Sequence, residues 1–129
     1  MAGQQRTRIL FMRFGFFGAV LFAVIMASLP QPPQIPGQPS DKVQHIIAFA
    51  VLTLLARLAY PATKRWRLFV NLAFLGALIE ALQAIPMLHR DASLLDWLAD
   101  CGAVAIIMGL MTFVGKVVAP VGNAPAEQS

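Results

Sequence analysis

Side chains that could carry chemistry occur in this chain as polar pairs, three or four residues apart, within otherwise apolar stretches. The pairs are Asp41 with His45, Glu80 with Gln83, and Asp96 with Asp100. Residues at this spacing lie on one face of a helix, so both members of a pair would face the same neighbour. A histidine within reach of carboxylates can accept or deliver a proton, and the set therefore suggests general acid–base chemistry.

Each pair also has a purely structural explanation. Ser93 and Asp96 fit the Ser-x-x-Asp pattern of a helix capping box. Asp41 would stand in a first helical turn, where the helix dipole alone favours an acid. Glu80 and Gln83 lie deep in an apolar segment, where the alternative is a hydrogen-bonded pair that holds two helices together. Capping and function therefore both remain open for Asp96.

The elements that must position these pairs are membrane helices. Of the 129 residues, 58% are hydrophobic and only 12% are charged. The apolar residues form blocks of about 20 residues, the length that a spanning helix needs. We therefore predict an all-α polytopic membrane protein, a bundle of four transmembrane helices at about 9–29, 43–60, 66–85 and 94–114. Residues 1–8 would form a cytoplasmic N-terminus, 9–118 the transmembrane domain and 119–129 a flexible tail.

Prolines mark several of the expected boundaries. Pro61 and Pro86 follow the second and third apolar blocks, because a proline cannot continue a helix. Residues 30–40 are proline-rich and are expected to be an extended connector, with a ligand for a proline-recognition domain as the alternative. The first block looks like a secretory signal peptide, but it is longer than a usual signal core and contains Arg13. We therefore expect a retained signal-anchor helix.

Lysine and arginine positions predict the orientation of the helices. If four spans alternate, Lys42 and Arg90 fall on one side of the membrane and all other basic residues fall on the opposite side, which is then cytoplasmic with both termini. Those residues are Arg6, Arg8, Arg13, Arg57, Lys64, Arg65, Arg67 and Lys116. Five of the six acids and both histidines then fall in the outer half of the bundle, although the assignment did not use them.

Charge and cysteine content exclude some classes of function. The net charge of +4 does not indicate a nucleic-acid partner, because the basic residues flank apolar blocks and form no patch. Cys101 is the only cysteine, so an intrachain disulfide is excluded. No compact metal motif is present and no cofactor is expected. A divalent cation held by Asp96, Asp100 and Glu80 is an alternative, since hard cations prefer oxygen ligands.

Three segments, 41–49, 76–83 and 90–100, follow the patterns D-K-x-x-H-x-x-x-F, G-x-x-x-E-x-x-Q and R-x-x-S-x-x-D-x-x-A-N, and are followed by Gly102 and Gly109. In this order and spacing they resemble the VanZ-like family of bacterial membrane proteins. The resemblance covers the chain from Asp41 to Gly109. Asp100 departs from the pattern because it stands where the family has asparagine, and the first helix carries no family motif.

The resemblance implies a place in the bacterial cytoplasmic (inner) membrane and a function in the cell envelope. The founding member is linked to teicoplanin resistance. A proposed relationship to lipid head-group exchange enzymes makes a membrane lipid or a lipid-linked glycan the expected partner.

In an enzyme of this kind, Lys42 and Arg90 would hold a phosphate. His45, oriented by Asp41 or Asp96, would act as base or nucleophile, and Glu80 would donate a proton. The catalytic residues would then be His45, Glu80 and Asp96. The substrate-binding residues would be Asp41, Lys42, Gln83, Arg90, Ser93 and Asp100.

Two other functions fit the same residues. A non-catalytic protein would recognise a lipid or glycopeptide in the outward-facing polar pocket. A small transporter or proton relay would need polar residues through the inner half of the bundle, which is apolar apart from Thr53 and Asn71. In an enzyme, His45→Ala and Glu80→Gln would abolish turnover and leave affinity intact, whereas in a binding protein affinity and phenotype would fall together.

Overall fold

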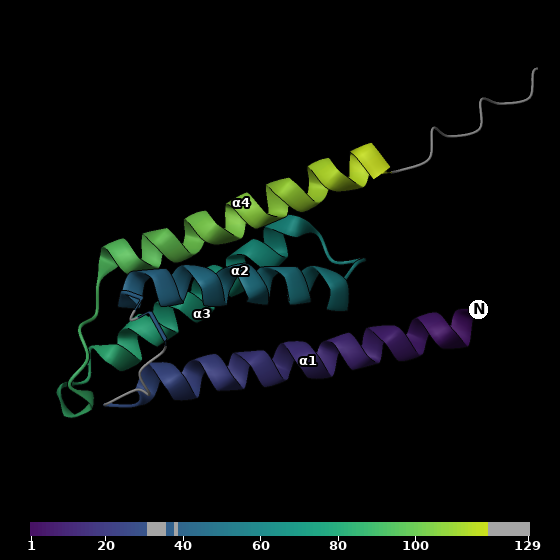
Figure 1. Ribbon diagram of the computed structural model, residues 1–129. Helices are drawn as coiled ribbons and strands as arrows, with labels where there is room; N and C mark the ends of the chain where they lie inside the picture. The colour runs from purple at the N-terminus through teal and green to yellow at the C-terminus, as the bar shows by residue number, and fades with distance from the viewer. Residues whose placement is uncertain (31–35, 38, 119–129) are drawn as a thin grey trace, which may run out of the picture.

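The computed structural model describes residues 1–30, 36–37 and 39–118, and the regular structure among these residues is helical, without a strand (Figure 1). The four long helices are α1 Ala2–Ser28, α2 Asp41–Ala59, α3 Arg65–Gln83 and α4 Leu94–Val118, and one short 3-10 helix, η1 Pro86–Leu88, follows α3. The extended connector expected at 30–40 falls largely outside the described residues, and the flexible tail expected at 119–129 falls wholly outside them.

Each of the four helices is long and apolar enough to cross a membrane. Their lengths of 27, 19, 19 and 25 residues come close to or exceed what a hydrocarbon core of about 30 Å requires at about 1.5 Å per residue. Large apolar side chains such as Phe14, Phe74 and Phe113 point outward and are more than half exposed. A surface of this kind is suited to lipid. The prediction of an all-α membrane protein with four spanning helices is confirmed.

Helices α1 and α4 are longer than the sequence predicted. α1 begins at Ala2 instead of Ile9, so the helix includes most of the segment 1–8, which was expected to precede it. α4 continues through Gly115 to Val118 instead of ending at Val114. Neither extension meets a proline. Each added residue gains a helical hydrogen bond, and a glycine inside a helix costs only about 1 kcal/mol.

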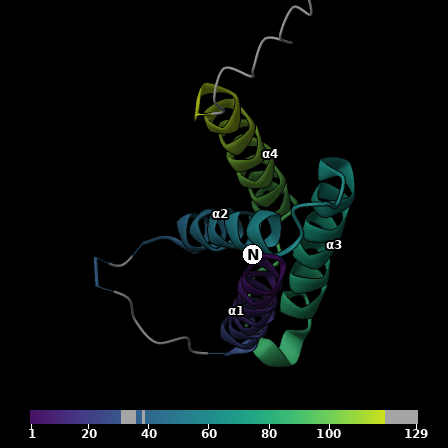
Figure 2. The ribbon, with the colours of Figure 1, turned by 90° about the vertical axis from the view of Figure 1, so that its right-hand side faces the viewer.

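Helix α2 occupies the centre of the bundle. It packs against both α1 and α4, while α3 packs mainly against α4. Figure 2, viewed from the end that holds the N-terminus, shows α1 and α4 on opposite sides of α2. Small residues are buried at these contacts, among them Ala27, Ala56 and Ala103. In lipid, helices associate through close packing, and small side chains allow their backbones to approach.

The two ends of the bundle differ in chemistry. α2 and α4 begin at the end where α1 and α3 finish, and the N-terminus lies at the opposite end together with the last turn of α4 (Figure 1). At that opposite end, Arg13 donates from Nε to the Ala59 carbonyl at 3.2 Å and lies 4.7 Å from the centroid of the Tyr60 ring. Arg13 therefore satisfies a carbonyl at the C-terminus of α2 and ties α1 to α2.

Candidate functional site

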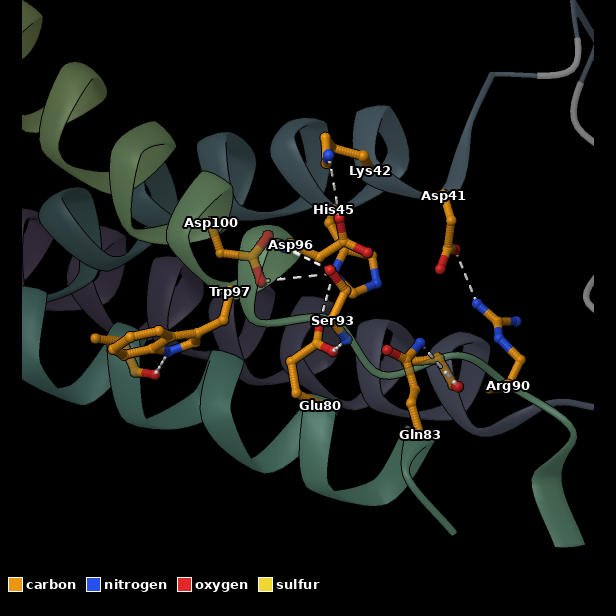
Figure 3. A network of polar contacts seen from close by, with 12 residues as sticks. Asp41, Lys42, His45, Glu80, Gln83, Arg90, Ser93, Asp96, Trp97 and Asp100 are labelled. Carbon is orange, nitrogen blue, oxygen red and sulfur yellow. Dashed lines mark hydrogen bonds and ion pairs between the residues drawn. The ribbon is translucent and has the colours of Figure 1, made fainter. Parts of the chain in front are cut away.

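The polar pairs meet at the end of the bundle where α2 and α4 begin and α3 ends (Figure 3). Because α2 and α4 start here, the later member of each pair, His45 or Asp100, lies one turn deeper than its partner. α3 runs the other way, so its earlier member, Glu80, is the deeper one. The three deeper members meet, and we call His45, Glu80 and Asp100 the buried triad.

In the buried triad a histidine nitrogen faces two carboxylates. His45 Nδ1 lies 3.6 Å from Glu80 Oε1 and 3.5 Å from Asp100 Oδ2. His45 is 7% exposed, Glu80 9% and Asp100 0%. Within the described part of the chain, Nδ1, Glu80 Oε1 and both Asp100 carboxylate oxygens are buried without a hydrogen-bond partner. Buried polar atoms rarely lack partners, which makes the triad the candidate functional site.

Asp41 and Asp96, expected from the sequence to orient His45, form a separate layer above the triad. Arg90 Nη2 donates to Asp41 Oδ1 at 2.9 Å, and Lys42 Nζ lies 3.7 Å from Asp96 Oδ1. That expectation is corrected because each acid lies one helical turn, about 5.4 Å, nearer the end of the bundle than the triad. The same two contacts occupy the cations that were assigned to a phosphate.

The start of α4 holds Glu80 in place. The Ser93 backbone N–H donates to Glu80 Oε2 at 2.7 Å, while Ser93 Oγ accepts from the Asp96 N–H at 3.4 Å. Ser93 therefore caps α4 as predicted. In a complete capping box the Ser93 N–H would donate to the Asp96 side chain, but here it donates to Glu80 instead. With Oε2 held, Glu80 Oε1 is left directed at the triad. Ser93 thus positions a member of the site.

Gly76 lets α3 and α4 come together beside the triad. A Cβ atom at this position would lie 3.2 Å from Trp97 Cδ1 and 3.4 Å from both Asp100 Oδ2 and Phe49 Cζ. Trp97 Nε1 donates to the Ala73 carbonyl of α3 at 2.9 Å. Trp97 therefore joins α3 to α4. The glycine and the indole together place Asp100 against His45.

Gln83 does not join Glu80 in the site. It is fully buried, and its Nε2 donates to the Ala27 carbonyl of α1 at 3.4 Å. The interhelical hydrogen bond considered as its structural explanation is therefore present, with a backbone partner. His89 and Asp91 are exposed in the loop that leads to α4.

A cavity of about 490 Å³ lies between α1 and α2 and reaches the polar end of the bundle. Its walls are apolar along both helices, and its polar lining residues are Asp41, Gln44, His45 and Arg90. Glu80 and Asp100 are not among the lining residues, so His45 alone belongs to both the cavity and the buried triad. Figure 3 shows the second imidazole nitrogen turned away from the two carboxylates.

Sequence reasoning missed the contribution of α1 to this cavity. α1 contributes Ala19, Phe22, Ala23, Met26 and Ala27 to the wall. The signal that could have revealed this face is the repeat of alanines at 19, 23 and 27, four residues apart on one side of the helix.

The buried triad offers one imidazole nitrogen and two carboxylates, with donor atoms within 4.8 Å of one another, and such a group could hold a metal ion. The cation site considered from the sequence used Asp96, Asp100 and Glu80. In the structure His45 takes the place of Asp96, which lies near Lys42 instead. The same groups could also share or transfer a proton. Comparisons of the chain with protein-family models, curated proteins and solved structures found no match.

Proposed function

We propose that this chain is a VanZ-like protein of the bacterial cytoplasmic membrane that binds an envelope lipid or lipid-linked glycan and acts on its phosphate-linked head group. The observation that carries the proposal is the α1–α2 cavity, which is apolar along its length and polar at the end where His45 lies. A lipid has the same division between an apolar chain and a polar head. A volume of about 490 Å³ lies within the range of roughly 300–1,000 Å³ common for small-molecule sites.

The distribution of basic residues supports the orientation in this proposal. With the basic ends of the helices in the cytoplasm, both termini are cytoplasmic and the polar end of the cavity lies near the outer surface. A lipid of the outer leaflet would then place its head group beside Arg90 and His45. Resistance to glycopeptide antibiotics would be one consequence of changing such a head group.

The chemistry proposed is transfer of a phosphate-linked group to an acceptor hydroxyl. The acceptor oxygen forms a bond to phosphorus as the bond to the leaving oxygen breaks, and His45 takes the proton from the first oxygen and returns it to the second. Arg90 and Lys42 would exchange their carboxylate partners for the phosphate. Glu80 and Asp100 touch Nδ1 and do not line the cavity, so they would act through His45 by stabilising its charged form.

A non-catalytic binding protein is the second candidate. It is favoured because Arg90 and Lys42 are already paired with carboxylates and are therefore not free to hold a phosphate. Arg90 Nη2 already donates to Asp41 at 2.9 Å, and its side chain is only 10% exposed. Among the residues that the structure describes, the cavity lining also contains no serine, threonine or cysteine that could act as a nucleophile. A protein built in this way could hold a lipid and change nothing in it.

A transport path through the inner half has less support. Thr53 is fully buried, and its hydroxyl donates to the Phe49 carbonyl of its own helix at 2.6 Å. Asn71 is exposed on the outside of α3. Neither residue continues the polar groups of the buried triad towards the opposite end of the bundle.

The test is binding and turnover of an envelope-lipid panel by the purified protein in lipid nanodiscs, with wild type compared to His45→Ala and Glu80→Gln. An enzyme predicts turnover by the wild type that is lost in His45→Ala and strongly reduced in Glu80→Gln, with lipid affinity kept in both. His89→Ala, which changes an exposed histidine, is the matched control and should keep full turnover.

The remaining outcomes separate the candidates. Binding by the wild type without any conversion, with affinity lowered in His45→Ala, would establish the binding protein and end the catalytic proposal. A wild type that binds none of the lipids would refute both candidates.

A further inference from the structure

We infer that the buried triad is a binding site for a divalent transition-metal ion of the Zn²⁺ or Mn²⁺ class. The three side chains come from three different helices, and their donor atoms lie within 4.8 Å of one another. His45 contributes a nitrogen, which suits such ions better than Mg²⁺ or Ca²⁺, and Glu80 and Asp100 contribute carboxylate oxygens. This inference is argued from the triad and does not depend on the lipid proposal. An ion on Nδ1 would leave the imidazole proton on Nε2, so the proton transfer proposed for His45 applies to the chain without the ion.

The separations of the donor atoms suit a small coordination sphere. Nitrogen and oxygen ligands lie about 2.0–2.1 Å from Zn²⁺, which places neighbouring tetrahedral ligands about 3.3–3.4 Å apart. His45 Nδ1 lies 3.6 Å from Glu80 Oε1 and 3.5 Å from Asp100 Oδ2. Both separations exceed the spacing of neighbouring ligands by no more than a few tenths of an ångström.

The donor atoms are buried and have no other partner. Within the described residues, Nδ1 of His45, Oε1 of Glu80 and both carboxylate oxygens of Asp100 make no hydrogen bond, and Asp100 is fully buried. An ionised carboxylate in this situation is stabilised by a compensating positive charge close by. Figure 3 shows the side chains of His45, Glu80 and Asp100 directed toward one another, with one oxygen of each carboxylate at Nδ1.

A divalent ion balances the charges of the triad with both carboxylates ionised. A protonated His45 would neutralise one of the two carboxylates and leave one negative charge. The nearby cations do not supply the second positive charge, because Lys42 lies beside Asp96 and Arg90 is bonded to Asp41. A divalent ion bound by a neutral imidazole and two carboxylates has no net charge left over, and bound cations commonly dominate the electrostatics of such sites.

The surroundings of the triad resemble the outer shell that fixes metal ligands. The Ser93 N–H bonds to the second oxygen of Glu80 at 2.7 Å, which orients Oε1. Asp100 packs where Gly76 leaves room for it. Hydrogen bonds and packing of this type hold ligating side chains in place before the ion arrives. Three protein ligands would leave a coordination position for water or for an atom of a bound molecule.

The experiment measures metal binding by the full chain, purified in detergent after removal of any histidine tag and stripped with a chelator. Zn²⁺ or Mn²⁺ is added alone, bound metal is quantified by mass spectrometry, and thermal unfolding is followed. We expect one ion per chain and a higher Tm with metal for wild type. His45→Gln and Asp100→Asn should lose both effects. The exposed controls His89→Gln and Asp91→Asn should keep them.

Two results would overturn the inference. One is a stripped wild type that gains neither metal nor thermal stability, and this result does not depend on whether any variant folds. The other is metal binding that persists in folded His45→Gln or disappears in His89→Gln, since the ion would then bind elsewhere. Failure of lipid turnover in a protein that binds one ion would leave the metal site standing and refute only the enzymatic function.

Discussion

Replacing Gly76 by leucine is expected to destabilise the bundle and to disturb the triad, because α3 and α4 have no room for a side chain at this position. The first added carbon, Cβ, would already lie 3.2 Å from Trp97 Cδ1 and 3.4 Å from Asp100 Oδ2. The rest of a leucine side chain would force these neighbours apart. Overpacking of this kind in a well-packed interior costs about 1–3 kcal/mol.

Gly102 provides the matched control, since a Cβ there meets no atom within 4 Å. Both substitutions replace a helical glycine by leucine and gain a similar helix propensity of about 1 kcal/mol, which cancels in the comparison. The difference between Gly76→Leu and Gly102→Leu should therefore be about 1–3 kcal/mol of unfolding free energy. Unfolding in mixed micelles with increasing denaturing detergent, followed by circular dichroism, measures this difference. Equal stability of the two variants would refute the close approach of α3 and α4 at Gly76.

The remaining predictions concern single contacts. Trp97→Phe keeps most of the ring but removes the Nε1 bond to the Ala73 carbonyl, and it should lower the unfolding free energy by about 1 kcal/mol in the same assay; an unchanged value would mean that the bond does not hold α3 to α4. Arg13→Gln removes the bond to the Ala59 carbonyl and the contact with the Tyr60 ring, and it should cost about 1–2 kcal/mol. Arg8→Gln, one turn or so earlier in α1, is its control, and equal effects would show that Arg13 contributes charge alone.

The helices could be predicted from the sequence because the lengths of the apolar blocks match a bilayer and because prolines follow two of them. Their exact ends could not be predicted in the same way. Residues 2–8 are mostly polar, and residues 115–118 begin with a glycine and a lysine, yet nothing in these segments opposes helix propagation, and α1 and α4 continue through them. Hydropathy reports where lipid can contact a helix, and the helix itself can extend beyond that region.

The site could be predicted only in the features that depend on residue spacing within a single helix. Helical spacing identified the pairs, and chain direction placed them at one end of the bundle. The partner of His45 was assigned wrongly, to Asp41 or Asp96, because spacing along one helix does not give relative depth between helices. Because α3 runs antiparallel to α2 and α4, Glu80 lies at the same depth in the bundle as His45 and Asp100. Asp100, which departs from the family pattern, is the most deeply buried member of the triad.

The most direct test of the proposed function is whether filling the α1–α2 cavity prevents lipid binding. Ala23 lines the cavity, whereas Ala77 is exposed on α3 and does not. The measurement is the amount of radiolabelled envelope lipid bound per chain by Ala23→Trp, Ala77→Trp and wild type in nanodiscs of a different lipid. The proposal predicts that Ala23→Trp loses specific binding while Ala77→Trp equals wild type. Equal binding by all three proteins would contradict the proposal, since the lipid would then bind outside the cavity.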